Sequence, residues 1–110
     1  MIVRVSTHVL DTAAGAPAAR IPALLEDVAT GRQAGTGCTD VDGRVARLND
    51  EPLAPGDYRL TLDVAAHLER VHGTVFHPRI TVHVRLDGAR EHYHVPVLVS
   101  PFSYTTYLGS

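Results

Sequence analysis

The sequence has little of what marks the common specialised classes of protein. Its single cysteine, Cys38, cannot form a disulfide within the chain and cannot alone build a structural zinc site. No stretch approaches the roughly 18 apolar residues that a membrane-spanning helix needs. The 10 Lys and Arg residues do not outnumber the 12 Asp and Glu residues, so there is no excess of positive charge to neutralise phosphates. We therefore expect neither a membrane nor a nucleic acid as partner.

Several catalytic and targeting motifs are also missing. The chain has no Gly-rich phosphate loop, no Gly-x-Ser-x-Gly elbow and no His-Glu-x-x-His metal motif. Its first residues contain no charged head followed by an apolar run, so we predict no signal peptide and a cytoplasmic location. Cys38 has no adjacent base, and a free cysteine of this kind is most often a small buried apolar residue.

What is present is the composition of an ordinary globular protein. The 110 residues are 45% hydrophobic and 20% charged, which predicts one domain over residues 1–110. A chain of this length buries roughly 65% of the surface that its unfolded form exposes, enough for a core without disulfides.

Hydrophobic residues mostly recur at every second position, the period of a β-strand. Asp-Gly pairs at 42–43 and 87–88 predict hairpin turns. One helix is predicted over 64–72, with Asp63 as its cap, an apolar stripe that includes Val71, and Gly73 at its end. The fold class is therefore all-β, a two-sheet β-sandwich of about eight short strands with one short helix. Strands are predicted over residues 2–10, 20–28, 36–39, 44–48, 58–62, 80–86 and 90–99.

Seven histidines are the unusual feature of the composition. Four of them, His67, His72, His77 and His83, are expected to be surface or structural residues. The first two lie on the predicted helix, where a spacing of five does not place them on a shared face.

His92 and His94 differ because they share one face of the last long predicted strand, while Tyr93 and its alternate neighbours share the other. Two imidazoles on a strand can ligate a metal, but they are fewer ligands than zinc takes. His8 or Cys38 would have to complete the set in space, and no local spacing indicates this. We predict no metal and keep metal capture as a minor alternative.

Four motifs, in order along the chain, resemble the transthyretin family and, within it, the bacterial 5-hydroxyisourate hydrolases. Residues 6–18 read STHVLDTAAGAPA and resemble the family's opening strand. Residues 39–45, TDVDGRV, match its T-x-x-D-G-R turn. Residues 92–101, HYHVPVLVSP, and 104–110, YTTYLGS, resemble its last long strand and its carboxyl terminus. The resemblance covers nearly the whole chain.

This resemblance implies two four-stranded sheets with one short helix, assembled as a homotetramer (a dimer of dimers) with active sites in the channel between dimers. It implies hydrolytic ring opening of 5-hydroxyisourate, a small molecule of urate degradation, without a cofactor. His8, Arg44 and His94 carry over as the catalytic set. The residues that carry over to the substrate pocket come from the C-terminal segment: Ser103, Tyr107, Leu108, Gly109 and Ser110.

The chemistry suits those residue types. An imidazole can take a proton from the attacking water near neutral pH, and a guanidinium or second imidazole can stabilise the resulting oxyanion. The sequence leaves open whether His8 or His94 is the base. Leu108 departs from the family pattern, which has arginine there, and this favours an alternative: a non-catalytic transthyretin-like protein that binds a small ligand in the intersubunit channel.

Overall fold

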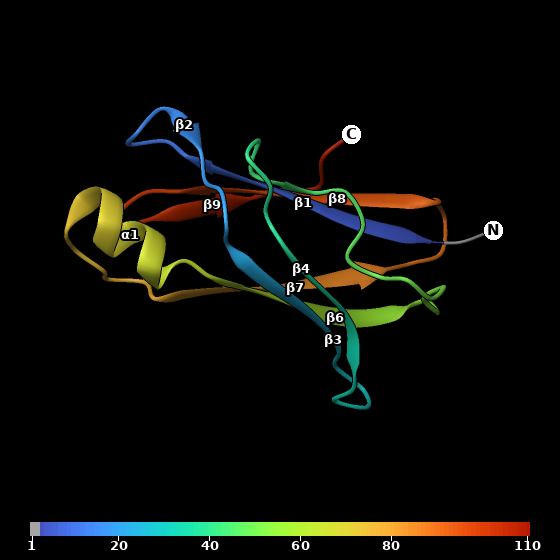
Figure 1. Ribbon diagram of the computed structural model, residues 1–110. Coiled ribbons are helices and arrows are strands. Elements are labelled where there is room, and N and C mark those ends of the chain that lie inside the picture. Colours follow the sequence, from blue (N-terminus) through green and yellow to red (C-terminus); the bar gives the residue numbers. More distant parts are fainter. Residues whose placement is uncertain (1–2) are drawn as a thin grey trace.

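In the computed structural model, residues 3–110 form two β-sheets packed face to face, with the one helix at one end of the sandwich (Figure 1). This confirms the predicted fold class. The elements in chain order are β1 (Arg4–Asp11), β2 (Ala16–Pro17), β3 (Pro22–Asp27), β4 (Gln33–Cys38), β5 (Arg44–Val45), β6 (Gly56–Asp63), α1 (Ala65–His72), β7 (Arg79–Leu86), β8 (His92–Val99) and β9 (Tyr104–Thr106).

The two sheets differ in size and in the direction of their strands. Sheet A has the order β2-β1-β8-β9, with β5 also pairing with β1, and sheet B has the order β4-β3-β6-β7. In sheet A the two long central strands, β1 and β8, are parallel. The expected four strands in this sheet become five because the two-residue strands β2 and β5 pair with different parts of β1.

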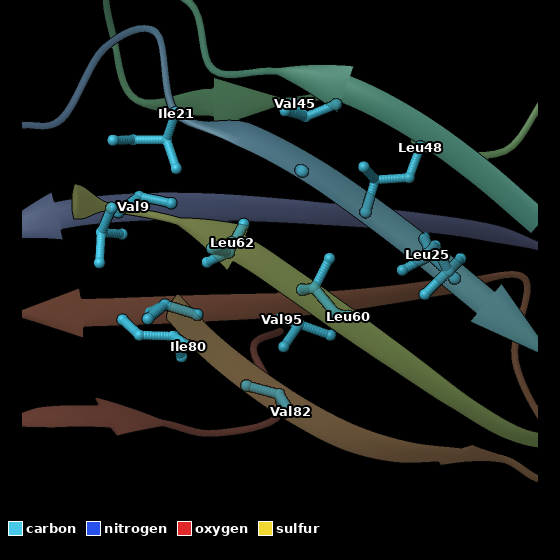
Figure 2. Close-up of a cluster of buried hydrophobic side chains, with 14 of the residues drawn as sticks. Val9, Ile21, Leu25, Val45, Leu48, Leu60, Leu62, Ile80, Val82 and Val95 are labelled. Carbon is cyan, nitrogen blue, oxygen red and sulfur yellow. The ribbon is translucent and has the colours of Figure 1, made fainter. Parts of the chain in front are cut away.

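The core lies between the sheets and is built by strand alternation, as the sequence predicts. Tyr58, Leu60 and Leu62 of β6 are at most 4% exposed, and Tyr93 and Val95 of β8 are at most 5% exposed. Side chains from both sheets meet in this layer (Figure 2). Burying an aliphatic side chain fully contributes about 1.5–3 kcal/mol, so the alternation fixes which face of each strand points outward.

Both predicted hairpins are wrong, although both Asp-Gly turns exist. Gly43 and Gly88 have φ values of 78° and 80°, the left-handed conformation that glycine adopts readily. The turn at Gly43 leads from β4 in sheet B to β5 in sheet A, and the turn at Gly88 leads from β7 in sheet B to β8 in sheet A. The chain therefore crosses between sheets at both points instead of folding back on the same sheet.

The helix follows the prediction with two differences. Gly73 ends it with φ 70° and donates its N–H to Glu69 O. Asp63 accepts a hydrogen bond from Ala65 N at 3.3 Å, but Val64 occupies the N-cap position. Val71 is 40% exposed, while His67 takes a buried position on the helix.

A further sequence-based expectation concerns the single cysteine. Cys38 is exposed at the end of β4, so the expectation that it is a buried apolar residue is wrong. Within residues 3–110, no helix is long and apolar enough to cross a membrane.

Asp11, the last residue of β1, holds the helix against sheet A. Its Oδ2 accepts hydrogen bonds from His67 Nε2 at 2.7 Å and from His72 Nε2 at 2.8 Å, and its Oδ1 accepts from Ala14 N at 2.8 Å. The two histidines thus share an acceptor, contrary to the expectation from their spacing. Helical spacing describes where side chains leave the backbone, and these imidazoles are long enough to converge on one carboxylate.

Replacing Asp11 with alanine is expected to lower the free energy of unfolding by about 3 kcal/mol, because it leaves two inward-facing imidazoles without their acceptor. Burial alone raises the pKa of Asp11, but hydrogen bonds from Ala14, His67 and His72 bring it below its ordinary value of 3.8. A lowered folded pKa gives stability that is present above pH 3.8 and lost as the pH falls through the folded value. Urea unfolding measured from pH 7 to pH 3 checks both parts, with the exposed Asp50→Ala as control. An equal loss at every pH would contradict the ionic role of Asp11.

Candidate active site

The candidate site lies on the outer face of sheet A, opposite the core. In the antiparallel pair β1–β5, His8 lies directly across from Arg44, and in the parallel pair β1–β8, Ser6 lies beside His94. The rings of His8 and His94 have their centroids 6.5 Å apart. The three residues proposed from the sequence as the catalytic set are therefore neighbours on one surface, although they are far apart in the chain.

A cavity of about 260 Å³ opens on this face. It contains two of the three expected catalytic residues, Arg44 and His94, and the predicted pocket residue Ser110. It also contains three side chains to which the sequence reasoning gave no role in hydrolysis: Arg4, Ser6 and His92. The period-two alternation of β1 places Arg4 and Ser6 on the same outer face as His8, and this pattern is the sequence signal that could identify them. The cavity is lined by Arg4, Ser6, Thr7, Arg44, Val45, Ala46, His92, His94 and Ser110.

His8 is oriented by the turn that precedes β5. Its Nε2 is 2.8 Å from Asp42 O, and because a carbonyl only accepts, this nitrogen carries the proton. In the neutral imidazole Nδ1 then holds the lone pair, and this atom has no hydrogen-bond partner among residues 3–110. The Asp40 carboxylate fixes the turn by accepting from Asp42 N at 2.9 Å and from Arg44 N at 3.0 Å. His8 is therefore presented as a proton acceptor at Nδ1.

His94 is held in its neutral form. Its pKa is lowered first by burial, which disfavours the charged imidazolium, and then by electrostatic repulsion from the titratable His92 and His8 and from the guanidinium groups of Arg44 and Arg4. Its Nδ1 lies 2.7 Å from Ser6 Oγ. At pH 7 this residue is an uncharged imidazole beside a guanidinium, a combination suited to receiving the negative charge that develops on a carbonyl oxygen under attack.

Gly109 brings the C-terminal segment onto the site. Its N–H donates to His94 O at 2.8 Å, forming an isolated bridge with β8. A Cβ at this position would lie 2.6 Å from His94 Cδ2 and 3.0 Å from Pro96 Cγ, so only glycine permits this approach. Ser110, the next residue, consequently reaches the cavity.

The other predicted pocket residues lie elsewhere in the isolated protomer. Ser103 is in the turn before β9, where its Oγ is 2.8 Å from Ser100 Oγ. Tyr107 and Leu108 are both 57% exposed and line a second cavity, of about 320 Å³, with residues of β7 and β8. Their role in substrate binding remains a prediction that depends on assembly.

The hydrogen bonds of His92 disfavour the alternative in which His92 and His94 bind a metal ion. His92 Nδ1 is 3.1 Å from Arg4 Nη2, and His92 Nε2 is 2.5 Å from Ser6 Oγ. Both of its nitrogens therefore already have partners. Across the described part of the chain, residues 3–110, no group of three His, Cys, Asp or Glu side chains is placed to hold a metal ion.

Together, the fold and the site define a class: a transthyretin-like β-sandwich with a cationic, imidazole-bearing site on the outer face of one sheet. Comparison with known proteins identifies a family within this class. Residues 5–109 match the HIUase/Transthyretin family, and the chain belongs to this family.

Similar proteins include 5-hydroxyisourate hydrolases and a transthyretin in complex with thyroxine. A 5-hydroxyisourate hydrolase from Salmonella dublin is 39% identical over 108 residues, covering 96% of this chain and 79% of that protein. The structure of Klebsiella pneumoniae 5-hydroxyisourate hydrolase has a TM-score of 0.86 and 30% identity, covering 98% and 94% of the two chains. Sea bream transthyretin, in complex with thyroxine, has a TM-score of 0.85 and 29% identity, covering 96% and 94%.

Proposed function

We propose that this protein hydrolyses 5-hydroxyisourate to 2-oxo-4-hydroxy-4-carboxy-5-ureidoimidazoline in urate degradation. The observation that carries the proposal is the meeting of His8, Arg44 and His94 on one sheet face, beside a cavity of about 260 Å³. The similarity to 5-hydroxyisourate hydrolases over 96% of the chain supports the same substrate.

The reaction opens a cyclic amide, which requires a base to deprotonate water and donors to stabilise an oxyanion. The site contains side chains of both kinds. One imidazole, from His8 or His94, takes a proton from water, and the hydroxide attacks the ring carbonyl carbon. Arg44 and the other imidazole donate hydrogen bonds to the oxyanion of the tetrahedral intermediate. The C–N bond then breaks, the ring nitrogen receives the proton, and the product is a carboxylic acid that ionises.

The active assembly in this proposal is a homotetramer, a dimer of dimers, with the site in the channel between dimers. Arg44 and Ser110 are exposed in the protomer, which leaves the cavity open to solvent. Large apolar side chains near β9 are also exposed, and such patches mark interfaces between proteins. Ser103, Tyr107 and Leu108 would join the substrate pocket through this assembly. The exposed large side chains here are Phe102, Tyr104, Tyr107 and Leu108.

The test uses purified protein with 5-hydroxyisourate generated in place by urate oxidase acting on urate. Decay of the compound is followed by absorbance and the handedness of the product by circular dichroism, against the spontaneous reaction. Acceleration with a product of one hand supports the hydrolase. A folded protein of tetrameric mass, measured by light scattering, that gives no acceleration overturns it.

A second candidate function is small-ligand binding without chemistry, and the similar sea bream transthyretin is in complex with one such small molecule, thyroxine. The observation that favours it is Leu108, an exposed apolar side chain at the position where the hydrolase pattern has arginine. Thermal stabilisation by an aromatic ligand with no product formed would support binding alone.

Replacing Leu108 with arginine is expected to raise activity on 5-hydroxyisourate about 10- to 100-fold. The reason is that a charge-assisted hydrogen bond contributes about 1.5–3 kcal/mol, and each 1.4 kcal/mol is a factor of about ten. Steady-state rates of the variant and of Leu108→Met, which changes shape without adding charge, provide the measurement and its control. If the arginine variant is no faster than the methionine variant, position 108 does not contact the substrate.

A further inference from the structure

A continuous chain of hydrogen bonds connects Arg4 to His94, one of the two candidate catalytic histidines. Arg4 Nη2 lies 3.1 Å from His92 Nδ1, His92 Nε2 lies 2.5 Å from Ser6 Oγ, and Ser6 Oγ lies 2.7 Å from His94 Nδ1. The chain connects alternate residues of β1 with alternate residues of β8, which the parallel register places side by side. It begins at the Arg4 guanidinium and ends at the His94 imidazole, and both side chains line the cavity.

The direction of the protons follows from the first residue of the chain. A guanidinium only donates, so His92 Nδ1 accepts from Arg4 and carries no proton. A neutral imidazole carries one proton, which must then sit on Nε2, so His92 donates to Ser6 Oγ. The tautomer of His92 is thus set by Arg4.

The last link follows from burial. Ser6 is 4% exposed, and its hydroxyl proton needs an acceptor, because an unpaired buried donor is costly. Among residues 3–110, Ser6 Oγ has two hydrogen-bond partners, His92 Nε2 and His94 Nδ1. His92 Nε2 donates to the hydroxyl, so only His94 Nδ1 can accept its proton. Donation to that atom satisfies every group in the chain. His94 then carries its proton on Nε2, which has no hydrogen-bond partner among the described residues and belongs to a side chain that lines the cavity.

We infer that Arg4, His92 and Ser6 are positioning residues that fix His94 as a hydrogen-bond donor through Nε2, which leaves His8 Nδ1 to take the proton from water. This rests on the proposed hydrolysis and assigns the two histidines different tasks within it. His8 accepts the proton of the attacking water, while His94 and Arg44 donate to the oxyanion. His8 then returns its proton to the ring nitrogen as the C–N bond breaks.

The charges around His94 are consistent with this assignment. Its charged or titratable neighbours are Arg4 and His8 from β1, Arg44 from β5 and His92 from β8. Burial and these groups lower the pKa of His94, so it stays neutral near pH 7. A donor at Nδ1 opposes a second protonation in the same way, because that proton would have to displace the Ser6 hydroxyl hydrogen.

The first measurement is nitrogen NMR of the uniformly ¹⁵N-labelled protein without substrate, which distinguishes the two neutral tautomers of each imidazole. The expected result is a proton on Nε2 of both His92 and His94. A proton on His94 Nδ1 would overturn the inference whether or not the protein is an enzyme. If the wild type does not hydrolyse 5-hydroxyisourate, the proposed function and the role of His8 fail, and the tautomer of His94 still decides whether Arg4, His92 and Ser6 position its proton.

The second measurement uses variants at the two ends of the chain. Arg4→Met removes the fixed donor, so His92 is free to reverse its tautomer and the Ser6 hydroxyl to turn towards His92. A proton is then expected on His94 Nδ1, with kcat lowered about 10- to 100-fold and KM little changed. Arg4→Lys restores a cationic donor and is expected to recover part of the rate. Arg47→Met, at an exposed arginine outside the cavity, is the matched control.

Ser6→Ala breaks the chain next to His94. We expect a similar loss of kcat and a titration midpoint for His94 that moves to higher pH, because the opposing donor is gone. Thr36→Ala, at an exposed hydroxyl on β4, is the control for removing a hydroxyl from a strand. Wild-type kcat and an unchanged His94 tautomer in Arg4→Met would overturn the inference even if Ser6→Ala fails to fold.

Discussion

Replacing His94 with alanine is expected to lower kcat for 5-hydroxyisourate about 10³-fold while leaving the protein folded. The imidazole is one of the two groups placed to donate to the oxyanion, and removing such a donor costs about 10²- to 10³-fold, with further loss where the group also assists proton transfer. The fold should survive because the residue faces outward from β8, and the adjacent Tyr93 and Val95 retain the core contacts. Initial rates, corrected for spontaneous decay, measure the effect.

The matched control is His83→Ala, which removes an exposed histidine from the outer face of β7. It changes the same side chain on the same kind of element without touching the cavity that His94 lines. Melting temperatures of both variants separate loss of chemistry from loss of fold. Wild-type turnover in a folded His94→Ala protein would remove this residue from the catalytic set and with it the proposed mechanism.

The outward and inward faces of the strands could be predicted from the sequence, but their partners could not. Alternation placed Leu60 and Val95 inside and His94 outside, because it depends only on the side-chain period of two. The strands after Gly43 and Gly88 alternate equally well whether they pair with the preceding strand or cross to the other sheet, because either choice turns the same apolar face to the core. An Asp-Gly turn therefore predicts a change of direction, and the identity of the next sheet depends on contacts distant in sequence.

The candidate site could not be assembled from the sequence pattern alone for the same reason, because it depends on which strands are neighbours. His8, Arg44 and His94 were found through the family resemblance, since nothing in their spacing shows that β1 lies between β5 and β8. Ser6 and Arg4 lie on the same face as His8 and were missed because a role for them appears only when β8 is placed alongside β1. Asp11, similarly, connects β1 to helix residues more than fifty positions later in the chain.

Replacing Arg44 with alanine is expected to lower kcat/KM about 10²- to 10³-fold, because it removes a permanent positive charge placed beside both His8 and His94. The effect should fall mainly on kcat, since the oxyanion that the guanidinium stabilises exists only after attack on the carbonyl. Arg44→Lys keeps the charge but loses the planar donor pair of the guanidinium, so only a partial recovery of rate is expected.

Rates for these two variants are best read against Arg32→Ala, which removes an exposed arginine from the loop between β3 and β4, in the other sheet. Arg44→Ala should also free His94 to protonate more readily, because Arg44 is one of the positive charges that lower the pKa of that imidazole. If kcat falls at low pH because His94 becomes protonated, this fall should therefore occur at higher pH in Arg44→Ala than in the wild type. If Arg44→Lys restored the full rate, a point charge would suffice at this position, and a directional hydrogen bond from the guanidinium to the oxyanion would be excluded.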